Sequence, residues 1–492
     1  MNEVAVAILL LAPVLGGLAV WRMIGRRAEI TAEISLGVTT VAALGLASAA
    51  LTGGRLVAFA DLISLDALGA YILALTATVA CLAMAASPRY VRHELTAGAF
   101  RQHDEGRFYA LFLWFVASLV VVPIVDNLGL LWVAIEATTM VSALLVGITR
   151  TPEAIEAAWK YLILGTIGVG FALLGTLLAY ASSVHVLGDS SDAMNWTRLM
   201  SIAPTLNPNL LRISFVFALA GYGTKIGLVP FHTWLPDAHS QAPSPVSALL
   251  SGVSITAALY ALIRFHLVAA AGLGPGFSST LLIAFGLLSL AVALPFLVRQ
   301  EDVKRLLAYS SIEHMGLLTL GIGFGGPLAL LGVILHLGLH AVTKATLFLS
   351  AGELVQQYGS RRLSRIRGTL ASAPVAGGAF GAGIVLLGGL PPSGIFATEF
   401  AIVVGGALAG YVVAAAIAAV LLALSFVALA VHGSRLLWGR TAPGISVVHV
   451  GRGMALRLAA PLFAVAILGL WTPGPLADAL NSIRAVLAVH GG

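Results

Sequence analysis

The chain has 492 residues, of which 59 % are hydrophobic and only 10 % are charged. Soluble globular proteins carry about 25 % charged residues, so this composition excludes that class and predicts a polytopic membrane protein whose first partner is the lipid bilayer. The net charge of +6 does not indicate nucleic-acid binding, because basic residues beside apolar segments set membrane orientation. A single cysteine, Cys81, excludes a disulfide framework and a cysteine-ligated zinc or iron–sulfur site.

Apolar runs long enough to cross a bilayer recur along the chain, since one membrane helix needs about 20 residues. They predict an all-α polytopic fold with about fourteen transmembrane helices. No basic residue precedes the first run, so we expect a retained helix rather than a signal peptide. The predicted helices cover residues 4–21, 30–51, 66–87, 108–125, 127–148, 159–181, 211–229, 244–270, 279–298, 306–325, 327–350, 372–408, 411–433 and 455–473.

Basic residues are distributed unevenly over the connections between these helices. Of the 27 Lys and Arg residues, twenty lie in odd-numbered connections, five in even-numbered connections or near the C-terminus, and two inside helices. Because cytoplasmic loops carry the excess of positive charge, both termini are expected on the non-cytoplasmic side of an inner (plasma) membrane. A buried lysine, unlike arginine, can lose its proton, so we interpret intramembrane Lys225 and Lys344 as titrating groups and Lys304 as interfacial.

The fifth predicted helix carries a carboxylate near the bilayer centre. Glu136 follows Asp126 by ten residues, which is about 15 Å along a helix. A carboxylate at that depth costs on the order of 3 kcal/mol and needs a cationic partner, a water path or its own proton. Glu136 is therefore a candidate proton carrier; the alternative is a protonated acid that makes one interhelical hydrogen bond.

The seventh predicted helix carries Lys225 and is broken at Pro230. Proline removes a backbone donor, and unwound backbone at membrane depth persists only where it is buried in protein or lines a cavity with water. This break is a candidate proton or ion site. The polar loop after it could suggest a metal, but its proline content favours gating or packing, and no metal site is predicted. Six further residues are possible accessory members of the predicted proton path: Asp126, Lys160, His232, Asp237, His239 and Thr256.

Ionisable residues cluster again in the tenth and eleventh predicted helices. Glu313 and His314 lie inside an apolar span, and the next helix carries His336, His340 and Lys344 at positions i, i+4 and i+8. Residues at this spacing project from one side of a helix. A lone histidine is more often a packing residue, whereas three titratable groups in a line predict a proton relay.

The twelfth predicted helix is broken at Pro391 and Pro392 and continues to Glu399. Two broken helices, five helices apart, indicate an internal repeat with transport groups at its interface. An odd number of helices inverts orientation, so helices four to eight and nine to thirteen are predicted to be inverted repeats. The predicted units are leading helices with a cytoplasmic loop at 1–107, repeats at 108–270 and 279–433, and a loop, a last helix and a tail at 434–492.

Together these motifs resemble the antiporter-like proton-translocating subunits. The resemblance rests on LLWVAIE ending at Glu136, VPFHTWLPDAH after Lys225, DVKR leading into YSSIEHMG, HAVTK ending at Lys344, and PPSGIFATE ending at Glu399. That family comprises the large membrane-arm subunits of respiratory complex I, related subunits of group 4 hydrogenases and formate hydrogenlyase, and Mrp antiporter subunits. The ATT after Glu136 and the IEHMG motif most resemble the hydrogenase-4 component F branch.

The resemblance implies a fourteen-helix subunit that moves protons inside a multi-subunit complex. It implies that Glu136 and Lys225 form a paired switch, that Lys344 and the eleventh-helix histidines form the central link, and that Glu399 is the terminal group. The chain itself is expected to bind no cofactor. Redox chemistry is then expected in a peripheral arm, reached through other membrane subunits.

One position departs from the family pattern. Complex I members often carry a lysine on helix eight where this chain has Thr256, which cannot hold a proton charge. The connection between Lys225 and His340 is therefore left to water, to His314 or to a rearranged path.

Two other functions stay open. One is a subunit of a Mrp-type cation/proton antiporter, although the intramembrane lysines favour protons over sodium. The other is a structural anchor, or the membrane module of an inorganic-carbon uptake complex, in which the buried charges carry no ions.

Overall fold

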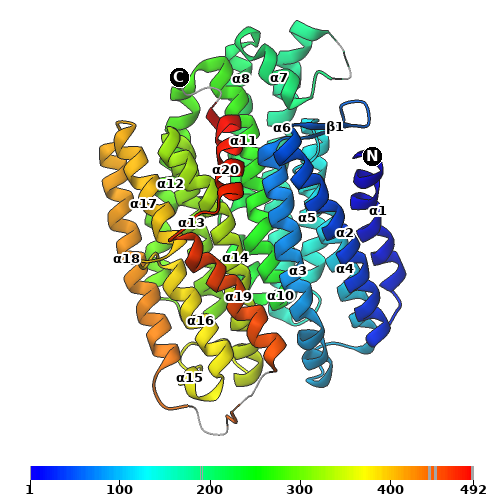
Figure 1. The fold of residues 1–492 in the computed structure, drawn as a ribbon, viewed down its shortest axis with the longest axis vertical. Coiled ribbons are helices and arrows are strands. Elements are labelled where there is room, and N and C mark those ends of the chain that lie inside the picture. The colour runs from blue at the N-terminus through cyan, green and yellow to red at the C-terminus, as the bar shows by residue number, and fades with distance from the viewer. Residues whose placement is uncertain (1, 189, 191, 442–444, 448–450, 489–492) are drawn as a thin grey trace.

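The computed structural model describes the chain except for residues 1, 189, 191, 442–444, 448–450 and 489–492. The described residues form a long bundle of helices with one small hairpin (Figure 1). The first helices are α1 (Asn2–Val20), α2 (Arg26–Gly53), α3 (Ala67–Thr96), α4 (Gln102–Val121), α5 (Leu128–Val146), α6 (Pro152–Leu187), α7 (Trp196–Ile202), α8 (Pro208–Ile226), α9 (Trp234–Gln241), α10 (Ser244–Leu249) and α11 (Ile255–Leu273). The others are α12 (Pro275–Val298), α13 (Val303–Phe324), α14 (Pro327–Tyr358), α15 (Thr369–Ser372), α16 (Pro374–Leu387), α17 (Gly394–Leu408), α18 (Val412–Leu437), α19 (Arg452–Leu468) and α20 (Gly474–Ala488).

Nine helical stretches in the described part of the chain are long and apolar enough to cross a membrane, which makes this a multi-pass membrane protein. They are α1, α2, α3, α5, α6, the stretch from α10 to α11, α12, α14 and α18. Helices also occupy the other segments predicted from the sequence, and α16 and α17 are shorter apolar helices.

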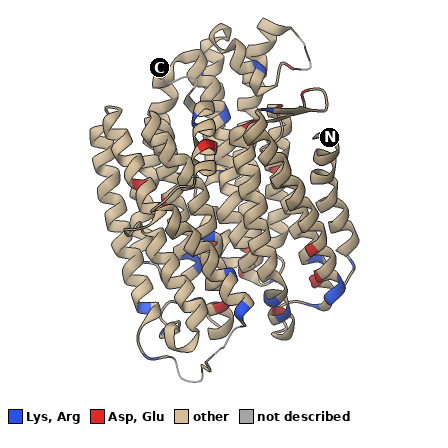
Figure 2. Cartoon of the chain, viewed as in Figure 1, with Lys and Arg blue, Asp and Glu red and all other residues tan. Residues whose placement is uncertain are grey.

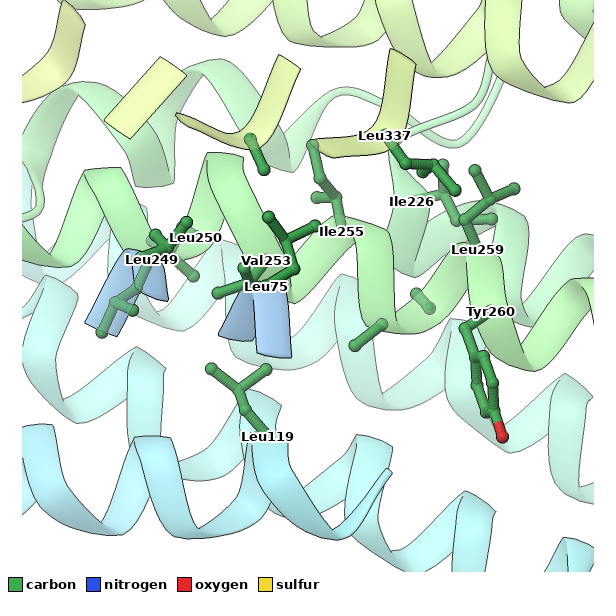
Figure 3. Packing of buried hydrophobic residues seen from close by; sticks show 14 of the residues in the cluster. Leu75, Leu119, Ile226, Leu249, Leu250, Val253, Ile255, Leu259, Tyr260 and Leu337 are labelled. Atoms are coloured by element: carbon green, nitrogen blue, oxygen red, sulfur yellow. The ribbon is translucent and has the colours of Figure 1, made fainter. Parts of the chain in front are cut away.

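The stretch from α10 to α11 lies at the centre of the bundle, and its most apolar window is wholly buried. In Figure 1, α1 to α4 lie on one side of it and α12, α17 and α18 on the other. Figure 3 shows Val253 of the central stretch close to Leu75 of α3 and Leu119 of α4. This apolar centre is the packed frame that holds the few polar side chains in place.

Two of the helices end inside the bundle. Helix α8 ends at Ile226, where Gly227 adopts a left-handed conformation (φ 86°), and Pro230 lies in the irregular segment before α9. Helix α16 ends at Leu387, and α17 begins at Gly394, after Ser393 accepts a hydrogen bond of 3.0 Å from the Phe396 amide. Both interruptions leave short segments rich in Gly and Pro between apolar helices.

The structure adds features that the sequence patterns do not predict. The helix expected at 244–270 contains a π-helical turn, η2 (Leu250–Ser254), between α10 and α11. The hairpin of β1 (Leu56–Ala58) and β2 (Ile63–Leu65) interrupts an otherwise helical fold, together with a 3-10 turn, η1 (Ala203–Thr205). In the region expected to be a tail, α20 packs against α3 and α14 and buries Leu480 and Ile483.

Lys and Arg gather mainly at one end of the bundle, the lower end in Figure 2, where the α1–α2 and α3–α4 connections lie. We call this the basic end. A few charged residues lie instead within the bundle, and they belong to the candidate site described below.

A buried ion pair ties α3 to α11 at the other end of the bundle. The Arg264 guanidinium is fully buried, lies 2.6 Å from an Asp66 carboxylate oxygen and stacks 3.9 Å from the ring centre of Trp196. Burial alone would raise the pKa of the Asp66 carboxyl, but Arg264 and the Gly69 amide outweigh burial and hold that pKa below its usual value. Asp66 lies just before α3 and caps its first turn.

Replacing Asp66 by asparagine is expected to destabilise the fold by about 3 kcal/mol, because the buried Arg264 charge loses its partner. A lowered native pKa means that the stabilisation is complete above the unfolded pKa of about 3.9 and disappears as pH falls further. Thermal unfolding in detergent at pH 7 and at pH 3 measures this, with the exposed Asp61→Asn as control. Equal melting temperatures for Asp66→Asn and the control at pH 7 would contradict it.

Candidate functional site

The first group of buried polar side chains surrounds Lys225, at the end of α8. The Lys225 ammonium is fully buried and donates hydrogen bonds to Thr139 Oγ1 (2.8 Å) and to the Tyr161 hydroxyl (2.6 Å). Tyr161 in turn stacks on Trp234 of α9 at 4.4 Å, and the Trp234 indole donates to the Thr224 carbonyl. The interrupted α8 thus places its one lysine against α5 and α6, where neutral hydroxyls bind it.

Glu136 lies one helical turn before Thr139 on the same face of α5. Its Oε1 accepts a hydrogen bond of 2.8 Å from Thr166 on α6, and its buried Oε2 has no hydrogen-bond partner among the described residues. In the described part of the chain, no ion pair within 4.0 Å joins Glu136 to Lys225. The two groups of the predicted switch therefore face the same α5–α6 region without direct contact, and Thr139 contacts the lysine in place of the carboxylate.

The second group lies where α13, α14 and α17 meet. His314 Nδ1 is 3.0 Å from His336 Nε2, and His336 Nδ1 is 2.8 Å from the Thr398 hydroxyl. His314 Nδ1 also lies 3.9 Å from a Glu399 carboxylate oxygen. The His340 ring centre is 5.2 Å from that of His314, and neither of its nitrogens has a hydrogen-bond partner among the described residues.

Lys344, one turn beyond His340 on α14, is also fully buried. Its ammonium donates a hydrogen bond of 2.7 Å to the Leu307 carbonyl on α13 and another to the Ser310 hydroxyl. Glu313 also lies on α13 and is 2 % exposed. The helix face that carries three titratable groups in the sequence therefore meets α13, which supplies two more.

The region between the two groups contains hydroxyls and one histidine. Thr256 donates to the Gly252 carbonyl inside the π-helical turn, and Ser251 of that turn bonds Ser311 of α13 at 2.8 Å. His239 of α9 is fully buried, with its ring centre 6.1 Å from Trp234. Its Nδ1 binds the Leu235 carbonyl, and its Nε2 has no hydrogen-bond partner among the described residues.

His239 is thus the ionisable residue that best links the side chains around Lys225 with those around Lys344. One of its ring neighbours, Trp234, stacks on Tyr161 beside Lys225, and the other, Phe348, lies one turn after Lys344 on α14. The Thr256 hydroxyl does not link the two groups, because it donates to the Gly252 carbonyl of its own helix.

The other accessory residues lie outside these two groups. Asp237 forms ion pairs with Arg305 (2.5 Å) and Lys160 (3.5 Å), so its carboxylate is occupied by cations rather than open to a metal. Asp126 accepts two hydrogen bonds from Thr197. His232 is half-buried, with its ring 6.4 Å from that of Phe296.

Lys304, which the sequence predicts to be interfacial, is buried inside the protein. It is 3 % exposed, and its ammonium donates to the Ala242 carbonyl, which remains open because the chain bends there between α9 and α10. Lys304 also lines a polar cavity of about 460 Å³ at the basic end, together with Glu94, Glu153 and Arg361. This cavity gives solvent a route to the ends of α10 and α13.

Sequence reasoning does not identify several residues that complete the two groups. Thr139, Tyr161, Ser310 and Thr398 are neutral, and nothing in their spacing distinguishes them from other hydroxyls in apolar helices. Glu313 has a clear signal, a carboxylate in an apolar run, yet the predicted relay omits it. The assembled site is a series of buried amines, imidazoles, carboxylates and hydroxyls, which are groups that can pass protons when water links them.

The sequence is similar to one family model and to curated relatives that are, by name, a homolog of a hydrogenase component and a subunit of an NADH-quinone oxidoreductase. Residues 125–425 match the family model described as NADH:quinone oxidoreductase/Mrp antiporter, TM. The chain is 40 % identical over 314 residues to a hydrogenase-4 component F homolog of Methylacidiphilum infernorum, a match that covers 64 % of this chain and 66 % of that protein. It is 34 % identical to NADH-quinone oxidoreductase subunit N of Desulforudis audaxviator, over 62 % of this chain and 60 % of that protein.

A solved structure also shares the fold. A chain of the membrane-bound sulfane sulfur reductase, an archaeal respiratory membrane complex, superposes with a TM-score of 0.86 at 23 % identity, over 99 % of this chain and 98 % of that one. The matches to the two curated relatives span less than two thirds of those proteins' lengths.

Proposed function

Because the chain belongs to the NADH:quinone oxidoreductase/Mrp antiporter membrane family, we propose that it is a proton-translocating membrane subunit of a redox-driven complex. The observation that carries this proposal is the series of ionisable residues inside the bundle, in which Glu136, Lys225 and Lys344 are buried and Glu399 is mostly buried. Isolated charges of this kind are expensive in a membrane and are retained for transport. The similarity to a hydrogenase-4 component F homolog supports a hydrogenase-like or complex I-like setting.

The proposed topology has fourteen spanning helices with inverted repeats at 108–270 and 279–433. The interruptions after α8 and after α16 support the repeat, since each ends an apolar helix close to an ionisable group, Lys225 in one case and Glu399 in the other. The concentration of Lys and Arg at the basic end supports placing that end in the cytoplasm, with both termini outside the cytoplasm in a plasma (inner) membrane.

In the proposed path, protons reach the site from the cavity beside Lys304. They then pass from Lys225 through His239 and bound water to Lys344, and through the histidines to Glu399. His239 replaces the missing base at Thr256 in this path, because its ring neighbours Trp234 and Phe348 belong to the two lysine groups and its Nε2 has no hydrogen-bond partner among the described residues. This chain binds no cofactor in the proposal. Electrons are handled by a peripheral arm that contacts it through other membrane subunits.

The proposed switch is a change in the contact between Glu136 and Lys225. With Thr139 and Tyr161 as its only polar partners among the described residues, the Lys225 ammonium lacks a counter-ion and tends to release its proton. If Glu136 moves toward Lys225 by about the length of one helical turn, the two side chains form an ion pair. The lysine then keeps its proton. A unit charge at such range shifts its neighbours by several kcal/mol at an effective dielectric near 20.

A Mrp-type cation/proton antiporter subunit is the second candidate, because the matched family model covers both types. Purification of the tagged chain in mild detergent separates the two. Hydrogenase or dehydrogenase subunits in the purified complex are the expected result. Recovery of antiporter subunits alone, with sodium-dependent proton exchange in vesicles, would overturn the redox assignment.

A further inference from the structure

The Thr398 hydroxyl, beside the histidine cluster, lies within hydrogen-bond distance of two groups. Its Oγ1 donates to the Ile395 carbonyl at 2.8 Å and lies 2.8 Å from His336 Nδ1. A hydroxyl has only one proton to donate. When that proton goes to the Ile395 carbonyl, Thr398 accepts from His336, and His336 carries its proton on Nδ1.

This tautomer determines the direction of the next hydrogen bond. A neutral imidazole has one N–H, so His336 Nε2 is an acceptor when Nδ1 is protonated. The group 3.0 Å from Nε2 is His314 Nδ1, which must therefore be the donor. The same His314 nitrogen lies 3.9 Å from Glu399 Oε1, which is beyond hydrogen-bond distance, so a small movement of either side chain would give this proton a second acceptor.

We propose that Thr398 is a positioning residue that fixes the Nδ1–H tautomer of His336 and thereby makes His314 Nδ1 the branch point between His336 and Glu399. This inference rests on the proposed relay function. The Thr398 hydroxyl already donates its proton to a backbone carbonyl, so a proton cannot travel from His336 past Thr398. His336 therefore only accepts the His314 hydrogen bond and holds that proton in place. Glu399 is the only one of the two acceptors that leads onward.

The transfer itself balances in protons. A proton that binds His314 Nε2 makes an imidazolium, and the Nδ1–H bond then breaks as a new bond forms to the ionised Glu399 Oε1. His314 is left neutral with its proton on Nε2. Two lone pairs, on His314 Nδ1 and His336 Nε2, would then face each other at 3.0 Å, so the rings must separate before the next cycle. The tautomer that Thr398 imposes thus opposes reuse of the branch point until it is reset.

Nitrogen-15 NMR of histidine-labelled protein tests the tautomer directly. The signals of His336 are assigned by their loss in His336→Gln, and the measurement uses the full chain in its purified complex. In the wild type and in Thr398→Ser, His336 is expected to be protonated at Nδ1. In Thr398→Val it is expected to be protonated at Nε2, because an Nδ1–H would be buried without an acceptor. Proton translocation is then expected to fall about tenfold or more, because His314 Nδ1 accepts from His336 and holds no proton for Glu399.

The matched control is Thr346→Val, which removes a hydroxyl from α14 that binds only its own helix, at the Val342 carbonyl. It should leave the His336 signals and translocation unchanged. An Nε2–H tautomer in the wild type, or an unchanged tautomer in a folded Thr398→Val, would overturn the inference. A wild type with the expected tautomer but no proton translocation would instead overturn only the proposed function.

Discussion

Replacing Lys225 by methionine is expected to reduce proton translocation at least about a hundredfold, because methionine keeps the side-chain volume but cannot bind a proton. Lys225→Arg should fail similarly, since arginine keeps the charge but does not release its proton. The measurement is the quenching of a pH-sensitive dye in everted membrane vesicles, normalised to the amount of inserted chain. Glu136→Gln is expected to follow the same pattern, because the neutral amide cannot form the proposed ion pair.

The control for Lys225 is Arg212→Gln, which removes an exposed charge at the other end of the same helix. It should translocate protons at the wild-type rate. If Lys225→Met inserts normally and also translocates at that rate, Lys225 is not a carrier, and the buried amine serves packing alone.

Replacing Lys344 by methionine is the second substitution with a large expected effect, again at least about a hundredfold on translocation. Lys344 binds Leu307 and Ser310 of α13 and follows His340 by one turn, so its loss separates the Lys225 group from the histidines. The same vesicle assay measures it, with the exposed Leu328→Ala on α14 as control.

This substitution also separates the relay from a structural anchor. An anchor predicts that Lys344→Met changes assembly of the complex but leaves ion flux per assembled complex unchanged. The relay predicts the opposite, with assembly retained and flux lost. Co-purification of partner subunits, measured on the same vesicles, decides between them.

Much of the fold could be predicted from the sequence, because bilayer thickness sets helix length and the apolar runs are long. The family resemblance is confirmed by the match over residues 125–425. The π-helical turn could not be predicted from residue spacing within the helix; at Gly252, within the turn, an added Cβ would meet Val79 and the Ala341 carbonyl, which come from distant helices. Helix α20 has a weaker apolar signal than a membrane helix and is held by packing on α3 and α14.

The site was only partly predictable for a related reason. Lys225 and the α14 residues are conspicuous as charges in apolar runs, and their proposed roles remain predictions. Which neutral groups bind them depends on how α5, α6 and α13 pack, and spacing within one helix carries no information on that. Lys304 illustrates the limit, because its buried ammonium binds the Ala242 carbonyl between α9 and α10, more than sixty residues earlier in the chain.

The central claim is that one connected series of buried groups carries protons across this chain, and His340 is its most exacting test. His340 lies between Lys344 and His314, and among the described residues neither of its ring nitrogens has a hydrogen-bond partner. The measurement is the number of protons translocated per electron in everted vesicles that contain the wild type or His340→Gln at equal abundance. The account predicts continued oxidation of the electron donor with a lower proton-to-electron ratio in the variant. An unchanged ratio would contradict it.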